Sequence, residues 1–235
     1  MRRHALISMA TLLLVGLLSG CGAAGRPPVA PPAPEPPAAA PAPVTPAPPP
    51  DARPVIACFG DSLTAGLGVS EKDNYPSQLQ RRLDAEGYNY HVVNLGISGD
   101  TSAGGLARLS EALSLKPRVM ILELGPNDGL RGTPVSETEK SLAKIIEQAQ
   151  AAGVTVVLAG MQMPPNLGPD YTAAFAQVFP DLATRYKLPL IPFFLEGVGG
   201  VRELNAADGS GHPNAAGYTI VTTNVWKVLR PLLQK

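Results

Sequence analysis

Apolar positions from residue 54 onward follow two different periods. Short apolar runs rich in β-branched side chains are typical of buried strands, and they occur at residues 55–59, 90–95, 118–124, 154–159 and 188–191. Longer segments with apolar residues at helical spacing predict helices at residues 75–86, 103–115, 136–152, 170–186 and 213–232. This alternation predicts an α/β fold in which helices cover both faces of a parallel sheet.

Polar and turn-forming residues at the ends of these segments support the helix assignments. Ser136 and Glu139 have the spacing of a capping box, which predicts the start of the helix at 136–152. Gly153 follows as a helix stop. Pro76 suits the first turn of the helix at 75–86, where its missing N–H costs nothing.

Residues 1–20 have the pattern of an export signal. A short basic start precedes an apolar run over residues 5–18, which has the length of a signal-peptide core and is short for a membrane span. The run ends in Leu-Ser-Gly before Cys21, which resembles the lipobox of bacterial lipoproteins and implies lipidation of Cys21. Gly22 is not a retention Asp, so we expect the periplasmic face of the outer membrane. The alternative is an ordinary secretory signal with a chance cysteine.

The segment that follows, residues 21–53, is expected to be a tether. Residues 27–50 contain 13 prolines in 24 positions and no large apolar side chain to bury beyond valine. Such a segment favours extended polyproline II, with a reach of roughly 70 Å at about 3.1 Å per residue. A recognition segment for a proline-binding partner is the alternative. The folded domain is then expected at residues 54–235.

Charge and cysteine content exclude several classes of function. The chain has 19 basic and 19 acidic residues, and this balance argues against nucleic acid as a partner. If Cys21 carries lipid, Cys58 is alone in an apolar strand, so no disulfide framework is expected and Cys58 is interpreted as a core residue. With His91 and His212 as the only histidines outside the signal and no metal-ligand cluster, neither a metal site nor a cofactor is expected.

Polar residues follow three of the predicted strands and precede the last helix. Ser62 comes after the first strand, Gly99 after the second and Asn127 after the third, while Asp208 and His212 lie just before the helix at 213–232. In a parallel sheet the carboxyl ends of the strands share one edge, so these residues can converge. The set suits acyl transfer, with Ser62 as nucleophile, His212 as its base and Asp208 orienting the imidazole.

The same chemistry requires donors for a tetrahedral oxyanion. The candidates are the backbone N–H groups of Ser62 and Gly99 and the side-chain amide of Asn127. Taken singly, each has a simpler interpretation: a helix cap at Ser62, a turn at Gly99 and an Asx turn at Asn127. Their joint occurrence in this order favours the catalytic interpretation.

Together these motifs resemble the SGNH (GDSL-type) hydrolases over residues 55–232. Gly-Asp-Ser-Leu at 60–63 matches the first block of that family, Gly99 the second, Asn127 the third and His212 the last. Within the family the chain is similar to the bacterial thioesterase I/protease I/lysophospholipase L1 and arylesterase group. The resemblance implies a flavodoxin-like three-layer α/β/α sandwich, here with a five-stranded parallel sheet, and metal-free hydrolysis of acyl esters and thioesters.

Two positions depart from the family pattern. Pro126 stands where a small residue or Gly is usual, and it fixes φ beside Asn127. Asp208 lies four residues before His212, whereas three is the usual spacing. We expect the extra residue to bulge outward, since Gly209 and Gly211 are flexible; a misdirected Asp208 is the alternative.

The expected substrate is a small acyl ester or thioester with a short-to-medium acyl chain. Loops after the third and fourth strands would line the acyl pocket, with candidate residues Leu130, Met161, Met163, Pro164 and Leu167, although each also suits a core position. An envelope carbohydrate O-acetylesterase and a non-catalytic envelope-binding lipoprotein are the alternatives. We expect a monomer.

Overall fold

Five parallel strands form the centre of the domain, which is described here from a computed structural model covering residues 51–235. The strands are β1 (Val55–Gly60), β2 (His91–Gly96), β3 (Val119–Glu123), β4 (Thr155–Ala159) and β5 (Leu190–Ile191). Their order in the sheet is β2-β1-β3-β4-β5. The chain thus adds β2 on one side of β1 and then β3, β4 and β5 on the other side, so the strand order reverses between β1 and β3. Ligands of such sheets bind at the carboxyl ends of the strands beside this point.

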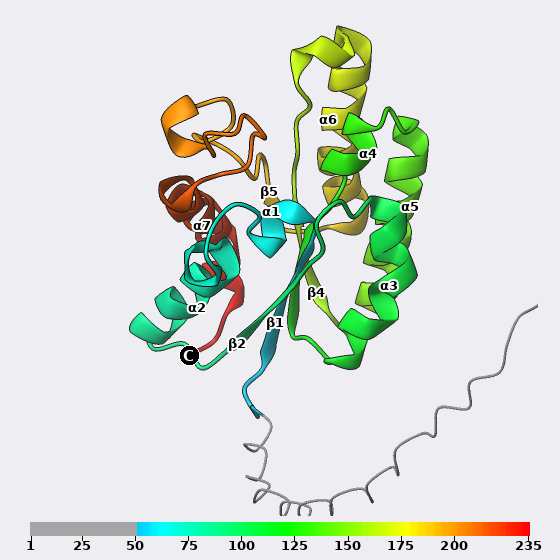
Figure 1. Cartoon of the computed structure of the whole chain (residues 1–235). Helices are drawn as coiled ribbons and strands as arrows, with labels where there is room; N and C mark the ends of the chain where they lie inside the picture. The colour runs from blue at the N-terminus through cyan, green and yellow to red at the C-terminus, as the bar shows by residue number, and fades with distance from the viewer. Residues whose placement is uncertain (1–50) are drawn as a thin grey trace, which may run out of the picture. The chain divides into compact units, whose positions relative to one another are not determined.

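Helices cover both faces of the sheet (Figure 1). α2 (Tyr75–Ala85) and α7 (Ala215–Leu229) pack together on one side, and α3 (Ser102–Ser114), α5 (Val135–Ala151) and α6 (Pro169–Tyr186) lie on the other. Two short helices, α1 (Ser62–Ala65) and α4 (Pro126–Leu130), follow β1 and β3 directly. The predicted three-layer α/β/α fold with five parallel strands is confirmed.

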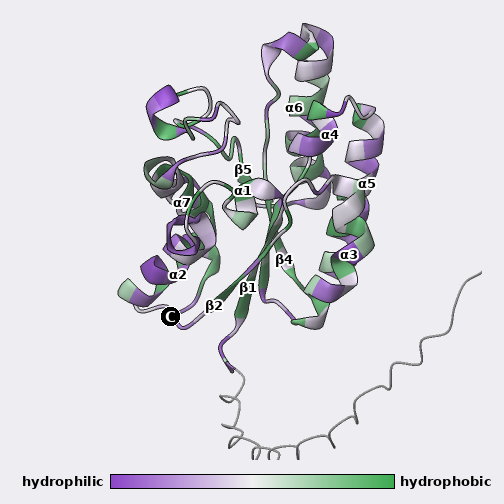
Figure 2. Ribbon diagram, in the orientation of Figure 1, coloured by the Kyte–Doolittle hydropathy of each residue, from purple (hydrophilic) through white to green (hydrophobic). Residues whose placement is uncertain are grey.

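The central strands are apolar because both of their faces are covered. Ile56, Cys58 and Phe59 of β1 and Ile121 and Leu122 of β3 have no exposed surface, and Figure 2 shows the strands in the colour of hydrophobic residues. Continuous apolar runs of this kind are expected of a sheet that is buried on both sides. The core thus forms a rigid platform beneath the carboxyl edge of the sheet.

Element boundaries differ from the predicted ones at a few places, each for a local reason. The capping box predicted at Ser136 is not formed: α5 begins one residue earlier, after Pro134, and no side chain caps it. Gly153 does stop this helix, with φ of 79°. β5 is only two residues long because Pro192 cannot donate to the ladder. α7 begins at Ala215, where the Asn214 side chain accepts the N–H of Gly217.

The predicted signal peptide, Cys21 and nearly all of the predicted tether lie outside the described residues. Within residues 51–235, no helix has both the length and the apolar character needed to cross a membrane.

Candidate active site

The turn after β1 presents Ser62 as the first residue of α1. Asp61 caps this short helix, because its Oδ1 accepts the backbone N–H of Leu63 at 2.9 Å. Gly60 is required just before it: a Cβ there would lie 2.1 Å from Oγ1 of Thr64 and 2.6 Å from the carbonyl oxygen of Glu123. The Gly-Asp-Ser sequence is therefore a tight strand-to-helix turn that fixes the serine.

Ser62 meets His212 at this edge of the sheet. The Ser62 hydroxyl lies 2.8 Å from Nε2 of His212. The carbonyl of His212 accepts the N–H of Ala206 at 2.8 Å, and Pro213 forms an isolated β-bridge with Asn205. These contacts hold the histidine against residues 205–206, and the serine and histidine are paired as predicted.

The contact predicted between Asp208 and His212 is not formed. The exposed Asp208 carboxylate accepts the backbone N–H of Ser210 at 2.9 Å, which is a local Asx turn. Nδ1 of His212 is buried, and no protein group in the described residues pairs with it. Gly209 and Gly211 have φ of 76° and 78°, so the longer loop uses two left-handed glycines and leaves the carboxylate away from the imidazole.

These surroundings shift the pKa values of both groups. Burial lowers the pKa of His212 below its ordinary value of 6.5, and the negative charge of Asp208 opposes this only in part. The hydrogen bonds from Ser210 are the main cause that lowers the pKa of Asp208. His212 is thus neutral at neutral pH, which is the form that accepts a proton from serine.

Asn127 comes to the same place from α4, where it is the second residue. Pro126 occupies the first helical position, which tolerates its missing N–H, and Gly125 before it has φ of 121°. The Asn127 amide donates to Oδ2 of Asp61 at 3.0 Å and to the carbonyl of Asp100 at 2.8 Å. It therefore links the residue before Ser62 to the residue after Gly99.

Gly99 lies in the loop after β2 with φ of 81°. Its carbonyl accepts Nη2 of Arg131 at 2.8 Å. Within residues 51–235, neither the N–H of Gly99 nor that of Ser62 donates to another protein group. Both N–H groups therefore remain available to an oxyanion. The Asn127 amide would become available by replacing one of its two acceptors, Asp61 or the carbonyl of Asp100, with the oxyanion.

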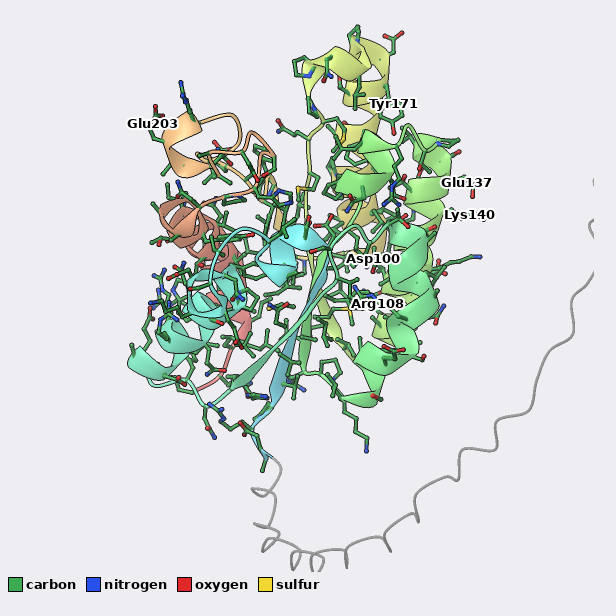
Figure 3. The ribbon with its side chains drawn as sticks, viewed as in Figure 1. Asp100, Arg108, Glu137, Lys140, Tyr171 and Glu203 are labelled. Carbon is green, nitrogen blue, oxygen red and sulfur yellow. The ribbon has the colours of Figure 1, made fainter. Side chains whose placement is uncertain are left out.

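Arg108 of α3 anchors this loop. Its Nε donates to Asp100 at 2.7 Å, and Nη1 and Nη2 donate to the carbonyls of Leu95 and Gly60 at 2.9 Å each. The guanidinium also stacks over the ring of Phe59, 4.1 Å from its centroid. Figure 3 labels Asp100 and Arg108 beside the sheet. One side chain thus joins the ends of β1 and β2 to the loop that carries Gly99.

A cavity of about 210 Å³ opens beside Ser62 and His212. Of the predicted pocket residues, three line it: Leu130, Met163 and Pro164. Ser62, Asn127 and His212 line it too, whereas sequence reasoning did not identify Gln162 and Leu195 as lining residues.

Two predicted pocket residues do not line this cavity. Met161, 3% exposed, belongs to the core. Leu167 lies in a short turn, Pro165–Leu167, beyond the lining segment.

Cys58 and His91 lie away from the cavity and belong to the framework of the sheet. Cys58 is fully buried in β1, and burial raises its pKa to about 12. His91 is at the amino end of β2, where Nδ1 lies 3.3 Å from Asp51. In residues 51–235, no group of three or more His, Cys, Asp or Glu side chains is arranged to hold a metal ion.

Comparison with known proteins gives the same classification as these motifs. Residues 58–220 match the GDSL-like lipase/acylhydrolase family. Esterase TesA of Pseudomonas aeruginosa is 49% identical over 175 residues, which cover 74% of this chain and 87% of TesA. Thioesterase 1/protease 1/lysophospholipase L1 of Escherichia coli is 37% identical over 183 residues, 77% of this chain and 86% of that one. A crystal structure of TesA has a TM-score of 0.73 at 48% identity and covers 76% of this chain and 99% of its own. This chain belongs to the GDSL-like lipase/acylhydrolase family.

Proposed function

We propose that the chain hydrolyses carboxylic esters or thioesters with short-to-medium acyl groups, through an acyl-enzyme on Ser62. The observation that carries the proposal is the 2.8 Å separation between the Ser62 hydroxyl and Nε2 of His212 beside a cavity. Membership of an ester- and thioester-hydrolase family supports the reaction class. The cavity volume, about 210 Å³, supports a short acyl group.

The two half-reactions follow from these positions. His212 takes the Ser62 proton as Oγ forms a bond to the acyl carbon, and the carbonyl electron pair moves to the oxygen. The N–H groups of Ser62 and Gly99 and the Asn127 amide stabilise that oxyanion. Its collapse breaks the bond to the leaving alcohol or thiol, which receives the proton from His212. Water then attacks the acyl-enzyme by the same route and releases the acid.

A panel of p-nitrophenyl esters of increasing acyl length tests this proposal on the purified domain, residues 54–235. We expect the highest kcat/KM on short-to-medium chains, loss of hydrolysis in Ser62→Ala and loss of nearly all hydrolysis in His212→Ala. An organophosphate probe should label Ser62 in the parent domain. Absence of labelling with a folded domain would favour a non-catalytic binding protein. This alternative is supported by Nδ1 of His212, which has no partner within residues 51–235.

Removal of acetyl groups from envelope carbohydrates is the second candidate activity. The small cavity favours it, because an acetyl group needs little space. The same residues would perform the chemistry. A kcat/KM on acetylated sugars above that on every p-nitrophenyl ester would select this activity over the first.

We also propose that the chain is a lipoprotein anchored through Cys21 to the periplasmic face of the outer membrane. The support is the apolar run at residues 5–18 followed by Leu-Ser-Gly-Cys. Incorporation of labelled fatty acid into the full chain, and its loss in Cys21→Ser, tests the anchor. Recovery of the protein in the inner-membrane fraction would contradict the proposed location.

A further inference from the structure

A pair of buried carboxyl groups lies directly beneath the nucleophile turn, and acyl transfer does not use it. Glu123, the last residue of β3, has no exposed surface, and Asp61 is 1% exposed. Oε2 of Glu123 accepts the Thr64 hydroxyl at 2.7 Å and the backbone N–H of Asp61 at 3.3 Å. Oε1 of Glu123 has no protein donor within residues 51–235. A buried carboxylate oxygen without a donor is costly, whereas a protonated oxygen can itself donate.

No basic side chain within residues 51–235 pairs with either carboxyl group, since Arg108 bonds Asp100 and the carbonyl of Gly60 instead. None of the ion pairs among residues 51–235 includes Asp61 or Glu123. The titratable groups that face the pair are the phenols of Tyr75 from α2 and Tyr218 from α7, with Asp100 near Asp61. All of these are acids, so the pair cannot carry two negative charges without compensation.

The two carboxyl groups therefore differ in how readily each loses its proton. Burial and the charge of Asp61 raise the pKa of Glu123 well above its ordinary range. Burial raises the pKa of Asp61 to about 6, and the hydrogen bond with Glu123 acts in the opposite direction by favouring the Asp61 anion. The raised pKa of Glu123 and the missing donor at its buried Oε1 both favour a proton on Glu123 and the charge on Asp61.

We propose that Glu123 is a positioning residue: as a neutral carboxylic acid, it donates a hydrogen bond to Asp61 and keeps that carboxylate ionised and correctly placed. Asp61 in turn fixes two parts of the site. Its Oδ1 holds the first turn of α1 through Leu63, and its Oδ2 holds the amide of Asn127. The proposal rests on the hydrolase function proposed above.

The expected effect is on kcat, because Asn127 serves the oxyanion and not the ground state. Loss of an oxyanion donor costs about 10²–10³ in turnover, and a loosened one should cost less. The apolar wall of the cavity comes from other residues, such as Leu130 and Met163, so KM should change little. The acid side of the pH profile should also move, because the Asp61 anion loses the hydrogen bond that stabilises it.

Two variants of nearly equal size separate hydrogen bonding from packing. Glu123→Gln keeps a neutral donor, and Glu123→Met keeps the length but removes all hydrogen bonding. With a short-chain p-nitrophenyl ester, we expect Glu123→Gln to retain kcat within about threefold and Glu123→Met to lose about tenfold or more, with KM nearly constant. In Glu123→Met the acid limb of kcat/KM should move to higher pH. Glu111→Gln, on the exposed surface of α3, is the control and should match the parent.

Infrared spectroscopy at neutral pH tests the protonation state without using activity. The parent domain should show a protonated carboxyl band that is absent from Glu123→Gln and present in Glu111→Gln. Absence of this band from the folded parent would overturn the proposal even if hydrolysis is normal. So would a folded Glu123→Gln that loses as much kcat as Glu123→Met, or a Glu123→Met that keeps parental kcat. If the parent shows the band but hydrolyses no ester, the proposed function fails and the assignment of the proton remains.

Discussion

Ser62 and His212 are 150 residues apart in the chain, and their hydroxyl and imidazole groups lie 2.8 Å from each other. Because burial lowers the pKa of His212, the base stays neutral to a lower pH than a free imidazole. Protonation removes the lone pair that accepts the serine proton, so activity is lost as pH falls through that pKa. We therefore predict an acid limb of kcat/KM below pH 6.5, which a pH–rate profile measures. Recovery of activity at neutral pH controls for unfolding, and a limb above 6.5 would contradict the prediction.

A second prediction concerns Asp208, whose carboxylate is bonded to Ser210 and not to His212. Where an aspartate holds a catalytic histidine, replacing it by Asn costs about 10⁴ in kcat. Here we predict that Asp208→Asn lowers kcat less than about tenfold, because the parent lacks that hydrogen bond. Steady-state kinetics with a short-chain ester provides the measurement.

Asp181→Asn is the matched control, since Asp181 is exposed and its carboxylate accepts a hydrogen bond from Gln177 on the same helix. A loss of about 10³ or more in Asp208→Asn alone would mean that the loop closes onto Nδ1 when substrate binds. In that case the two glycines that flank Ser210 would be the hinge.

The alternation of strands and helices and the convergence of Ser62, Asn127 and His212 could be predicted from the sequence. Parallel strands bring their carboxyl ends to one edge, so residues that follow separate strands share a site wherever the sheet forms. The pairing of Asp208 could not be predicted, because it depends on backbone angles at Gly209 and Gly211 that sequence does not constrain.

Two other outcomes depended on side-chain direction. Met161 and Met163 look equivalent in sequence, but the former enters the core and the latter lines the cavity. Glu123 ends a strand that is otherwise apolar and buried. A charged residue at such a position was the one sequence feature that could have indicated the buried pair of Glu123 and Asp61. Its partner Asp61 was interpreted only as part of the serine motif, since the contact with Asn127 arises from tertiary structure.

A third prediction concerns Arg108, whose side chain is 14% exposed and bonds three acceptors. Arg108→Lys can replace only part of this planar set, because Lys offers a single ammonium. We predict a loss of about 2–4 kcal/mol in the free energy of unfolding, since part-buried carbonyls lose their donors. Urea denaturation measures it. Arg185→Lys, an exposed arginine paired with Glu139, is the control and should change stability by less than about 1 kcal/mol.

The last prediction concerns acyl-chain selectivity at Met163. This side chain lies over Gly129 of α4: a Cβ on Gly129 would be 2.1 Å from the Met163 sulfur. Met163→Ala removes that side chain from the cavity wall and extends the space available to the acyl group. We predict that the ratio of kcat/KM for longer over shorter p-nitrophenyl esters rises about tenfold, since one methylene in an apolar pocket is worth about 1–3 kcal/mol.

Met161→Ala is the matched control, because it truncates the same kind of side chain two residues away in the core. It should lower the free energy of unfolding by about 2–5 kcal/mol and leave the chain-length ratio unchanged. Gly129→Ala should act in the opposite direction to Met163→Ala, because the new methyl group pushes the Met163 side chain further into the cavity. If Met163→Ala and Met161→Ala alter the ratio equally, the selectivity arises from general loosening of the fold and not from the wall that Met163 forms.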